Sequence, residues 1–97
     1  ETPKDCAMRE LEEETSYLAG HLEKIASFYT SPGFSSEMLH LFVGTDLVPG
    51  TGQPDDDEII ETYRLSREDV ETMIRDGEIR DAKTLLGLAT VISRGLF

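Results

Sequence analysis

The sequence is poor in cysteine, in basic residues and in long hydrophobic runs. Its 97 residues include one cysteine, Cys6, which excludes an intrachain disulfide framework, so we expect a reducing, cytoplasmic setting. Nine Lys and Arg residues against 20 Asp and Glu give a formal charge of −11. This balance disfavours nucleic-acid partners, which need a basic face, and favours a cation ligand or a solvated surface. The apolar runs are far shorter than the roughly 20 residues that cross a bilayer, so we expect no membrane span.

A helix is predicted from residue 3 to about residue 15. Thr2 is a suitable N-cap, Pro3 suits the first helical position, and Asp5 lies three residues after the cap. Neither Gly nor Pro interrupts the chain from there to Thr15. This first helix therefore has a clear start and a length of several turns.

The rest of the chain is predicted to form strands followed by two helices. Three stretches are rich in β-branched and aromatic residues or alternate apolar with polar ones, and are expected to be strands: residues 22–30, 38–43 and 59–65. The composition of residues 49–57 indicates a loop. Ser66 and Asp81 are expected to cap the two helices. This order predicts an α/β sandwich with a thin, three-stranded sheet.

Three glutamates of the first helix carry the chemical information. Glu10, Glu13 and Glu14 lie at i, i+3 and i+4, so their carboxylates are expected on one helix face, where like charges repel. A divalent cation resolves this conflict, because Mg²⁺ and Mn²⁺ prefer hard oxygen ligands. Arg9 can pair with Glu13 and hold the array in place. The alternative is a solvated acidic face without a ligand.

The spacing of these charges favours the first interpretation. Glu1, seven residues and then the run Arg9–Tyr17 resemble the Nudix box, G-x5-E-x7-R-E-U-x-E-E-x-G-U, in which U is bulky and apolar. Leu11 and Tyr17 fill the two U positions. The leading Gly is absent because the chain begins at the first Glu. Ser16 replaces the second Gly, and a left-handed Ser there would cost about 1 kcal/mol.

The downstream sequence resembles the ADP-ribose pyrophosphatase branch of that family. The run Ser31–Glu37 is similar to its S-P-G-x-[ST]-x-E loop, and residues 55–61 are similar to its acidic D-E-x-E-x-x-E segment. Residues 81–84 resemble the start of its last helix. The resemblance implies a Nudix-type α/β/α sandwich with a mixed sheet, of which residues 1–97 are the C-terminal portion of one domain. We therefore expect N-terminal strands in a longer protein, and a homodimer.

The resemblance also implies a metal centre and its ligands. Glu10 and Glu14 would be the principal ligands of Mg²⁺ (or Mn²⁺), and Glu13 would be the third ligand and a catalytic residue. Glu1 would support the array, from behind the direct ligands or through water. The cations would bridge the diphosphate of the substrate, neutralise developing charge and lower the pKa of bound water.

A base for the attacking water would come from the late acidic loop. Glu58 is the first choice and Asp57 the second, although a solubilising loop tip is the alternative. Glu37 and Arg9 are candidates for contact with the substrate, whereas the neighbouring Ser-Pro-Gly run is equally well explained as a plain turn.

The leading hypothesis is therefore a Mg²⁺-dependent hydrolase that splits ADP-ribose, or a related nucleoside-diphosphate sugar, into AMP and a sugar phosphate. A second hypothesis is another Nudix substrate, such as a dinucleotide. A third is a catalytically inactive Nudix fragment or a Nudix-fold binding module. The 97-residue chain alone is expected to hydrolyse ADP-ribose poorly.

Overall fold

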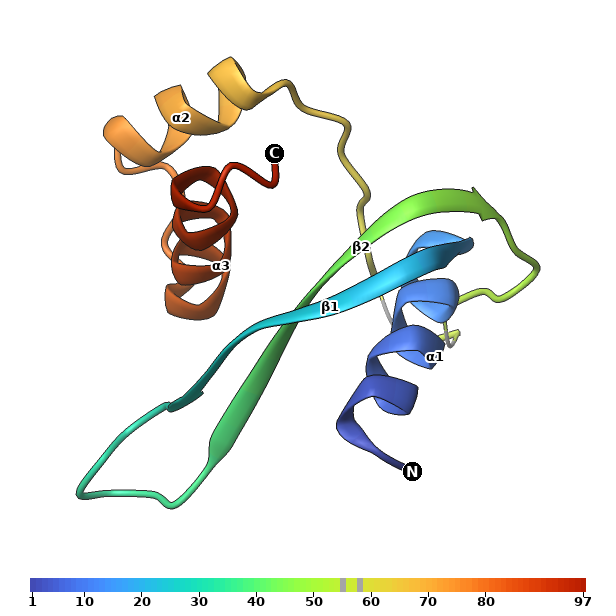
Figure 1. Ribbon diagram of the computed structural model, residues 1–97, viewed down its shortest axis with the longest axis horizontal. Coiled ribbons are helices and arrows are strands. Elements are labelled where there is room, and N and C mark those ends of the chain that lie inside the picture. Colours follow the sequence, from blue (N-terminus) through green and yellow to red (C-terminus); the bar gives the residue numbers. More distant parts are fainter. Residues whose placement is uncertain (55, 58) are drawn as a thin grey trace. The chain divides into compact units, whose positions relative to one another are not determined.

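The computed structural model spans the 97-residue chain and describes residues 1–54, 56–57 and 59–97. The described residues form three helices and two strands (Figure 1): α1 Pro3–Thr15, β1 Tyr17–Tyr29, β2 Met38–Pro49, α2 Arg67–Arg75 and α3 Ala82–Ser93. The chain forms two compact units, Glu1–Thr62 and Tyr63–Phe97. This mixture of helices and strands confirms the expected α/β class.

Helix α1 begins and ends as its sequence predicts. The Thr2 hydroxyl accepts a hydrogen bond from the Asp5 N–H at 3.1 Å, and Pro3 occupies the first turn, where a missing N–H costs nothing. The helix ends at Ser16, whose φ of 62° and ψ of 26° are left-handed. The Ser16 N–H donates to the Glu12 carbonyl at 2.8 Å, which closes the last turn. The left-handed conformation expected at Ser16 is thus confirmed.

Strands β1 and β2 form a long antiparallel hairpin (Figure 1). The register runs from the pair Tyr17↔Pro49 to the pair Tyr29↔Met38 and shifts once, between Lys24 and Ala26. Both predicted strands exist, but the hairpin extends beyond them, to Tyr17 in β1 and to Pro49 in β2. Cross-strand hydrogen bonds continue along the ladder, so pairing adds residues whose own composition does not predict a strand.

The first helix packs on the hairpin where a glycine leaves room. Gly44 pairs with Leu22, the buried residue of β1, which is 7% exposed. A Cβ atom at position 44 would lie 3.3 Å from Leu11 Cδ2 and 3.4 Å from Leu22 Cδ1. Leu11, the first apolar position of the box pattern, therefore lies against the sheet over Gly44. This contact determines which face of α1 packs on the hairpin and which face points away from the hairpin.

The strand predicted at residues 59–65 is not formed, which is a correction to the sequence analysis. These residues have no regular secondary structure, and in the described part of the chain they pair with neither β1 nor β2. The side chain of Ile59 is 96% exposed and that of Tyr63 is 69% exposed. An alternating pattern forms a strand only when it pairs with a neighbouring strand and buries one face, and in the described residues this stretch does neither.

The second unit is a pair of helices with the predicted caps. The Ser66 hydroxyl accepts from the Asp69 N–H, and the Asp81 carboxylate accepts from the Thr84 N–H, each at 3.1 Å. Helix α2 stops before Gly77, whose φ is 73°. Two valines are buried in this unit: Val70 and Val91. In the described part of the chain, every helix is too short or too polar to span a membrane.

Candidate metal-binding and catalytic site

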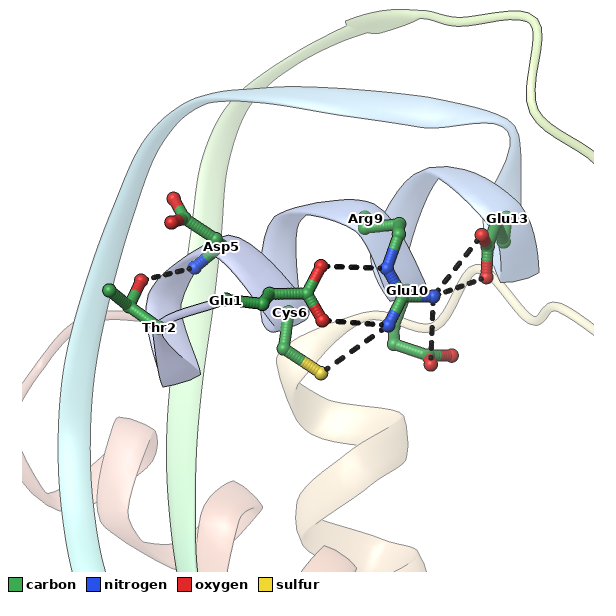
Figure 2. Close-up of polar contacts among 7 residues, drawn as sticks. All are labelled: Glu1, Thr2, Asp5, Cys6, Arg9, Glu10 and Glu13. Carbon is green, nitrogen blue, oxygen red and sulfur yellow. Dashed lines mark hydrogen bonds and ion pairs between the residues drawn. The ribbon is translucent and has the colours of Figure 1, made fainter.

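One arginine gathers three carboxylates on α1 (Figure 2). Arg9 Nε lies 2.9 Å from Glu1 Oε2 and Nη2 lies 3.0 Å from Glu1 Oε1, which is a two-pronged contact. Arg9 Nη1 lies 3.1 Å and 3.2 Å from the two Glu13 oxygens and 3.3 Å from Glu10 Oε1. The predicted pair of Arg9 with Glu13 is present, and Glu1 supports the array through Arg9. We call these four residues the Arg9 cluster.

The Arg9 cluster is open to solvent and keeps excess negative charge. The side chain of Arg9 is 46% exposed, and those of Glu1, Glu10 and Glu13 are 41–44% exposed. The hydrogen bond from Arg9 lowers the pKa of Glu1, and the bonds to Glu1 and Glu13 raise the pKa of Arg9. Three negative charges face one positive charge. Because exposed ion pairs add little to stability, this arrangement orients carboxylates more than it holds the fold together.

The third predicted helix ligand is not part of this cluster. Glu14 is exposed, and its side chain has no hydrogen bond or ion pair with the residues that the structure describes. Within those residues, no three Asp, Glu, His or Cys side chains are grouped as they would be around a metal ion. The chemistry of the donors still fits a hard divalent cation. A cation that takes Glu10 and Glu13 together must compete with Arg9 for their oxygens.

A second set of contacts fastens the loop after β2 to the end of α1. Glu12 Oε2 accepts hydrogen bonds from the N–H groups of Thr51 and Gly52, at 3.1 and 3.3 Å. The Ser16 hydroxyl donates to the Gly52 carbonyl, and the Gly50 N–H donates to the Ser16 carbonyl, each at 2.8 Å. We call these five residues the loop clamp. The sequence analysis missed Glu12, because the box pattern leaves its position free.

The two glycines of the loop clamp lie so close to Glu12 that a Cβ atom at either position would crowd it. A Cβ at Gly50 would lie 2.8 Å from Glu12 Oε2. A Cβ at Gly52 would lie 2.9 Å from Glu12 Cγ and 3.0 Å from the Glu12 carbonyl oxygen. At Gly50 the end of the flexible Glu12 side chain could move aside, whereas at Gly52 the Cβ would also meet the Glu12 backbone, so the loop backbone lies directly on Glu12 at Gly52. The G-x-G spacing directly after a strand is the sequence signal that points to this close approach.

The acidic segment follows the clamp directly. Asp56 and Asp57 lie in an exposed turn. Asp55 and Glu58 lie outside the described residues, so the first choice for the base, Glu58, is not placed. Asp57, the second choice, is described but is exposed.

Glu37 lies at the other end of the hairpin from the loop clamp. It precedes Met38 at the hairpin connection, and its carboxylate accepts a hydrogen bond from the Thr30 hydroxyl at 2.8 Å. The Thr30 N–H also donates to the Glu37 carbonyl, at 3.2 Å. These contacts close the connection between the strands. Among the described residues, no hydrogen bond or ion pair links Glu37 to the Arg9 cluster.

A small apolar cavity of about 230 Å³ lies beside the first turns of α1. Cys6 and Ala7 of α1 and Phe42 of β2 are among its lining residues. The thiol of Cys6 accepts a long hydrogen bond from Arg9, at 3.8 Å. His40, which also lines it, is bonded to the Ser27 hydroxyl at 2.8 Å. These contacts are those of packing residues.

Comparison with known proteins identifies the family. The sequence matches the NUDIX domain family over residues 1–87. The ADP-ribose pyrophosphatase of Bacillus subtilis is 43% identical over 86 residues, which are 87% of this chain and 46% of that protein. The GDP-mannose pyrophosphatase of Pectobacterium atrosepticum is 37% identical, over 99% of this chain and 51% of the relative. A Bacillus methanolicus protein named methanol dehydrogenase activator is 37% identical, over 91% of this chain and 49% of the relative.

The chain spans about half the length of these curated relatives. The family match covers the box residues, the hairpin and both later helices as far as residue 87. The Nudix resemblance inferred from Glu1, Arg9 and the glutamates of α1 is therefore confirmed. The chain belongs to the NUDIX domain family.

Proposed function

We propose that the protein carrying this chain is a pyrophosphohydrolase that needs Mg²⁺ or Mn²⁺ and cleaves the diphosphate of a nucleoside-diphosphate sugar. ADP-ribose is the first candidate, giving AMP and a sugar phosphate. The observation that carries the proposal is the Arg9 cluster, in which one guanidinium orients carboxylates at the spacing of the box. Two relatives are named for ADP-ribose and GDP-mannose, so their names support this class of substrate rather than one sugar.

Glu10, Glu13 and Glu14 are the proposed metal ligands. A bound cation neutralises charge on the diphosphate oxygens and lowers the pKa of a water molecule. Arg9 keeps Glu10 and Glu13 oriented, and Glu1 occupies the other edge of the guanidinium. Glu14, whose carboxylate has no hydrogen bond or ion pair with a described residue, is the carboxylate most available to a cation.

In the proposed reaction, the oxygen of a water molecule attacks one phosphorus of the diphosphate. The bond from that phosphorus to the bridging oxygen breaks, and the oxygen leaves with the other phosphate. A carboxylate must take the proton of the attacking water. We assign this role first to Glu58, second to Asp57, and consider Glu13 a further candidate.

The proposed substrate contacts are weaker assignments. All three kinds of nitrogen in the Arg9 guanidinium already donate to carboxylates, so a direct bond to substrate would displace one of them. Glu37 accepts a hydrogen bond from the Thr30 hydroxyl at the hairpin connection, so a substrate group that binds its carboxylate would share it with Thr30.

The competing function is a Nudix-fold protein that acts without hydrolysis, as an inactive or binding module. One relative is named an activator of another enzyme, which shows that similar sequences carry names of a different kind. The two functions differ in whether turnover depends on the helix carboxylates.

Hydrolysis of ADP-ribose and GDP-mannose by the complete protein tests the proposal. AMP or GMP release is measured with Mg²⁺, with Mn²⁺ and with a chelator. Glu14→Gln keeps the shape of the side chain and removes its charge, and it should lower kcat at least about a hundredfold if Glu14 is a ligand.

Glu68→Gln, on the exposed face of α2, is the matched control and should retain full activity. Turnover by the wild type that persists with chelator, or normal turnover by Glu14→Gln, would refute the metal role. No turnover of either substrate by the wild type would leave the binding module as the function.

A homodimer in the cytoplasm is the setting that we propose. Each strand of a two-stranded sheet has one free edge, and free edges favour pairing with another chain. Leu47 and Val48 of β2 are 48% and 52% exposed, which supports an apolar contact. Light scattering of the complete protein measures the mass, and a monomer at micromolar concentration would contradict the dimer.

A further inference from the structure

The carboxylate of Glu12 is used within the chain, unlike those of its neighbours. Its Oε2 atom accepts two hydrogen bonds from consecutive backbone N–H groups, at Thr51 and Gly52. Two backbone N–H groups therefore share one carboxylate oxygen, and hydrogen bonds to an ionised acceptor are stronger than those to a neutral one.

The position of Glu12 is costly without these bonds. Glu12 lies in the last turn of α1, where the helix dipole disfavours a negative charge. It also lies beside Glu13 and two residues from Glu10 and Glu14, so its charge adds to an already acidic turn. Two charge-assisted hydrogen bonds offset this, and they connect residues 39 and 40 positions apart.

We propose that Glu12 is a positioning residue that holds the segment after Gly52, which carries Asp57, near the carboxylates of α1. This role rests on the proposed function, because it assumes that the segment supplies the base. Residues three and four apart share a helix face and successive residues differ by about 100°, so one turn of α1 carries both the proposed ligands and the clamp.

The chain length limits how far the segment can move from the clamp. Asp57 follows Gly52 by five residues, so it can lie at most about 18 Å from the fixed point. Without the clamp, the nearest fixed point is the end of β2 at Pro49, and the reach increases by three residues, about 10 Å. The clamp therefore narrows the region in which a base can lie, and a base that is misplaced by about 1 Å can cost a hundredfold in rate.

Glu12→Ala in the complete protein tests this role. The variant loses the two hydrogen bonds of Glu12 and leaves the two of Ser16, so the loop is loosened at Thr51 and Gly52. It should lower kcat roughly tenfold to a hundredfold, while KM for ADP-ribose and the affinity for Mn²⁺ measured by calorimetry stay within about twofold. Glu12→Gln keeps an oxygen that accepts both N–H groups and should recover kcat to within about threefold of wild type. Glu68→Ala on α2 is the matched control.

Amide hydrogen exchange at Thr51 and Gly52 separates the clamp from the hydrolysis. Exchange there should become faster in Glu12→Ala and stay near the wild-type rate in Glu12→Gln. Faster exchange with an unchanged kcat would overturn the positioning role, and unchanged exchange would overturn the clamp. A wild type that hydrolyses no diphosphate would refute the proposed function and the catalytic part of this inference together, while the exchange rates still decide whether the clamp exists.

A second variant approaches the clamp from the other side. Gly52→Ala leaves Glu12 intact but places a Cβ 2.9 Å from its Cγ, so the loop must shift. It should lower kcat as Glu12→Ala does. Because both changes break one contact, the double variant should lose clearly less than the product of the two single losses, and fully multiplicative losses would count against a shared contact.

Discussion

Two sets of contacts on α1 differ in how far along the chain they reach. In the Arg9 cluster, Arg9 binds Glu1, Glu10 and Glu13, all within eight residues of it. In the loop clamp, Glu12 binds backbone groups 39 and 40 residues away. The Arg9 cluster sets the charge and direction of the carboxylates, and the loop clamp fastens the loop after β2 to the same helix. The difference shows that one short helix can carry a local electrostatic device and a long-range anchor within the same two turns.

Activity should be more sensitive to the loss of a single charge in the Arg9 cluster than in the loop clamp. Arg9→Gln leaves three carboxylates without their shared partner, so kcat/KM at saturating Mg²⁺ should fall roughly tenfold to a hundredfold. Unfolding in urea should change little, because these ion pairs are exposed. Arg9→Lys keeps the positive charge and should recover part of the lost activity. The recovery should be incomplete, because an ammonium group cannot form the two-pronged contact with Glu1.

Arg67→Gln is the matched control for this experiment. Arg67 pairs with Glu71 at 2.7 Å on α2, with the same i, i+4 spacing and a similar exposure. It should leave activity unchanged. Equal losses in the Arg9 and Arg67 variants would mean that exposed i, i+4 pairs in general, rather than the Arg9 cluster, support activity.

The stability of the fold should be more sensitive to added side-chain volume in the loop clamp than in the Arg9 cluster. Gly52→Ala should reduce the free energy of unfolding by about 1–3 kcal/mol, because its Cβ would meet the backbone of Glu12. Gly44→Ala is the comparison within the hairpin, where the Cβ would meet side-chain atoms of Ala19, Leu11 and Leu22 at 3.2–3.4 Å. Gly44→Ala should cost less, because the ends of Leu11 and Leu22 can move and the contact with Ala19 Cβ, at 3.2 Å, is longer than those at Gly52. Urea unfolding measures both, and a larger cost at Gly44 would contradict the rigid contact of the loop with α1.

Ser16 ends α1 and belongs to the loop clamp, so its replacement should change both a hydrogen bond and the backbone strain. Ser16→Ala keeps the left-handed φ of 62° but loses the hydrogen bond to the Gly52 carbonyl, so stability should fall by about 1 kcal/mol. Ser16→Gly loses the same bond but relieves the backbone strain, so its stability should lie within about 0.5 kcal/mol of wild type. Equal losses in both variants would mean that the left-handed conformation carries no strain.

The difference in contact range also explains what the sequence could predict. The caps at Thr2, Ser66 and Asp81 and the pairing of Arg9 with Glu13 depend on neighbours within four residues, and all are confirmed. The two strands were predicted too short, because their outer parts are added by pairing with each other. The stretch 59–65 alternates like a strand, but strand formation depends on a partner that its own residues do not specify.

The site followed the same rule. Glu10 and Glu13 were predicted to share a face, and both lie on Arg9. Glu12 was missed because no pattern within the helix distinguishes it from an exposed glutamate. Its role depends on where Thr51 and Gly52 lie, which the fold decides. Patterns with fixed local spacing were therefore informative, whereas contacts across 40 residues required the structure.

The smallest effect is expected when acid protonates Asp81, whose hydrogen-bond partners Lys83 and Thr84 lie two and three residues away in the sequence. Asp81 accepts hydrogen bonds from Lys83 Nζ at 2.8 Å and from the Thr84 hydroxyl and N–H, which lower its pKa from 3.8 to about 2. A lowered pKa in the folded state means that the ionised carboxylate stabilises the start of α3 above about pH 4, and that this contribution is lost as the pH falls toward 2. Helical circular dichroism should decrease slightly over this window. Asp81→Asn keeps an N-cap acceptor and removes the titration, so its signal should lose the part of the decrease that Asp81 causes. An identical acid response in both proteins would show that Asp81 does not stabilise α3 through its charge, and that local spacing alone is a poor guide to electrostatic stabilisation.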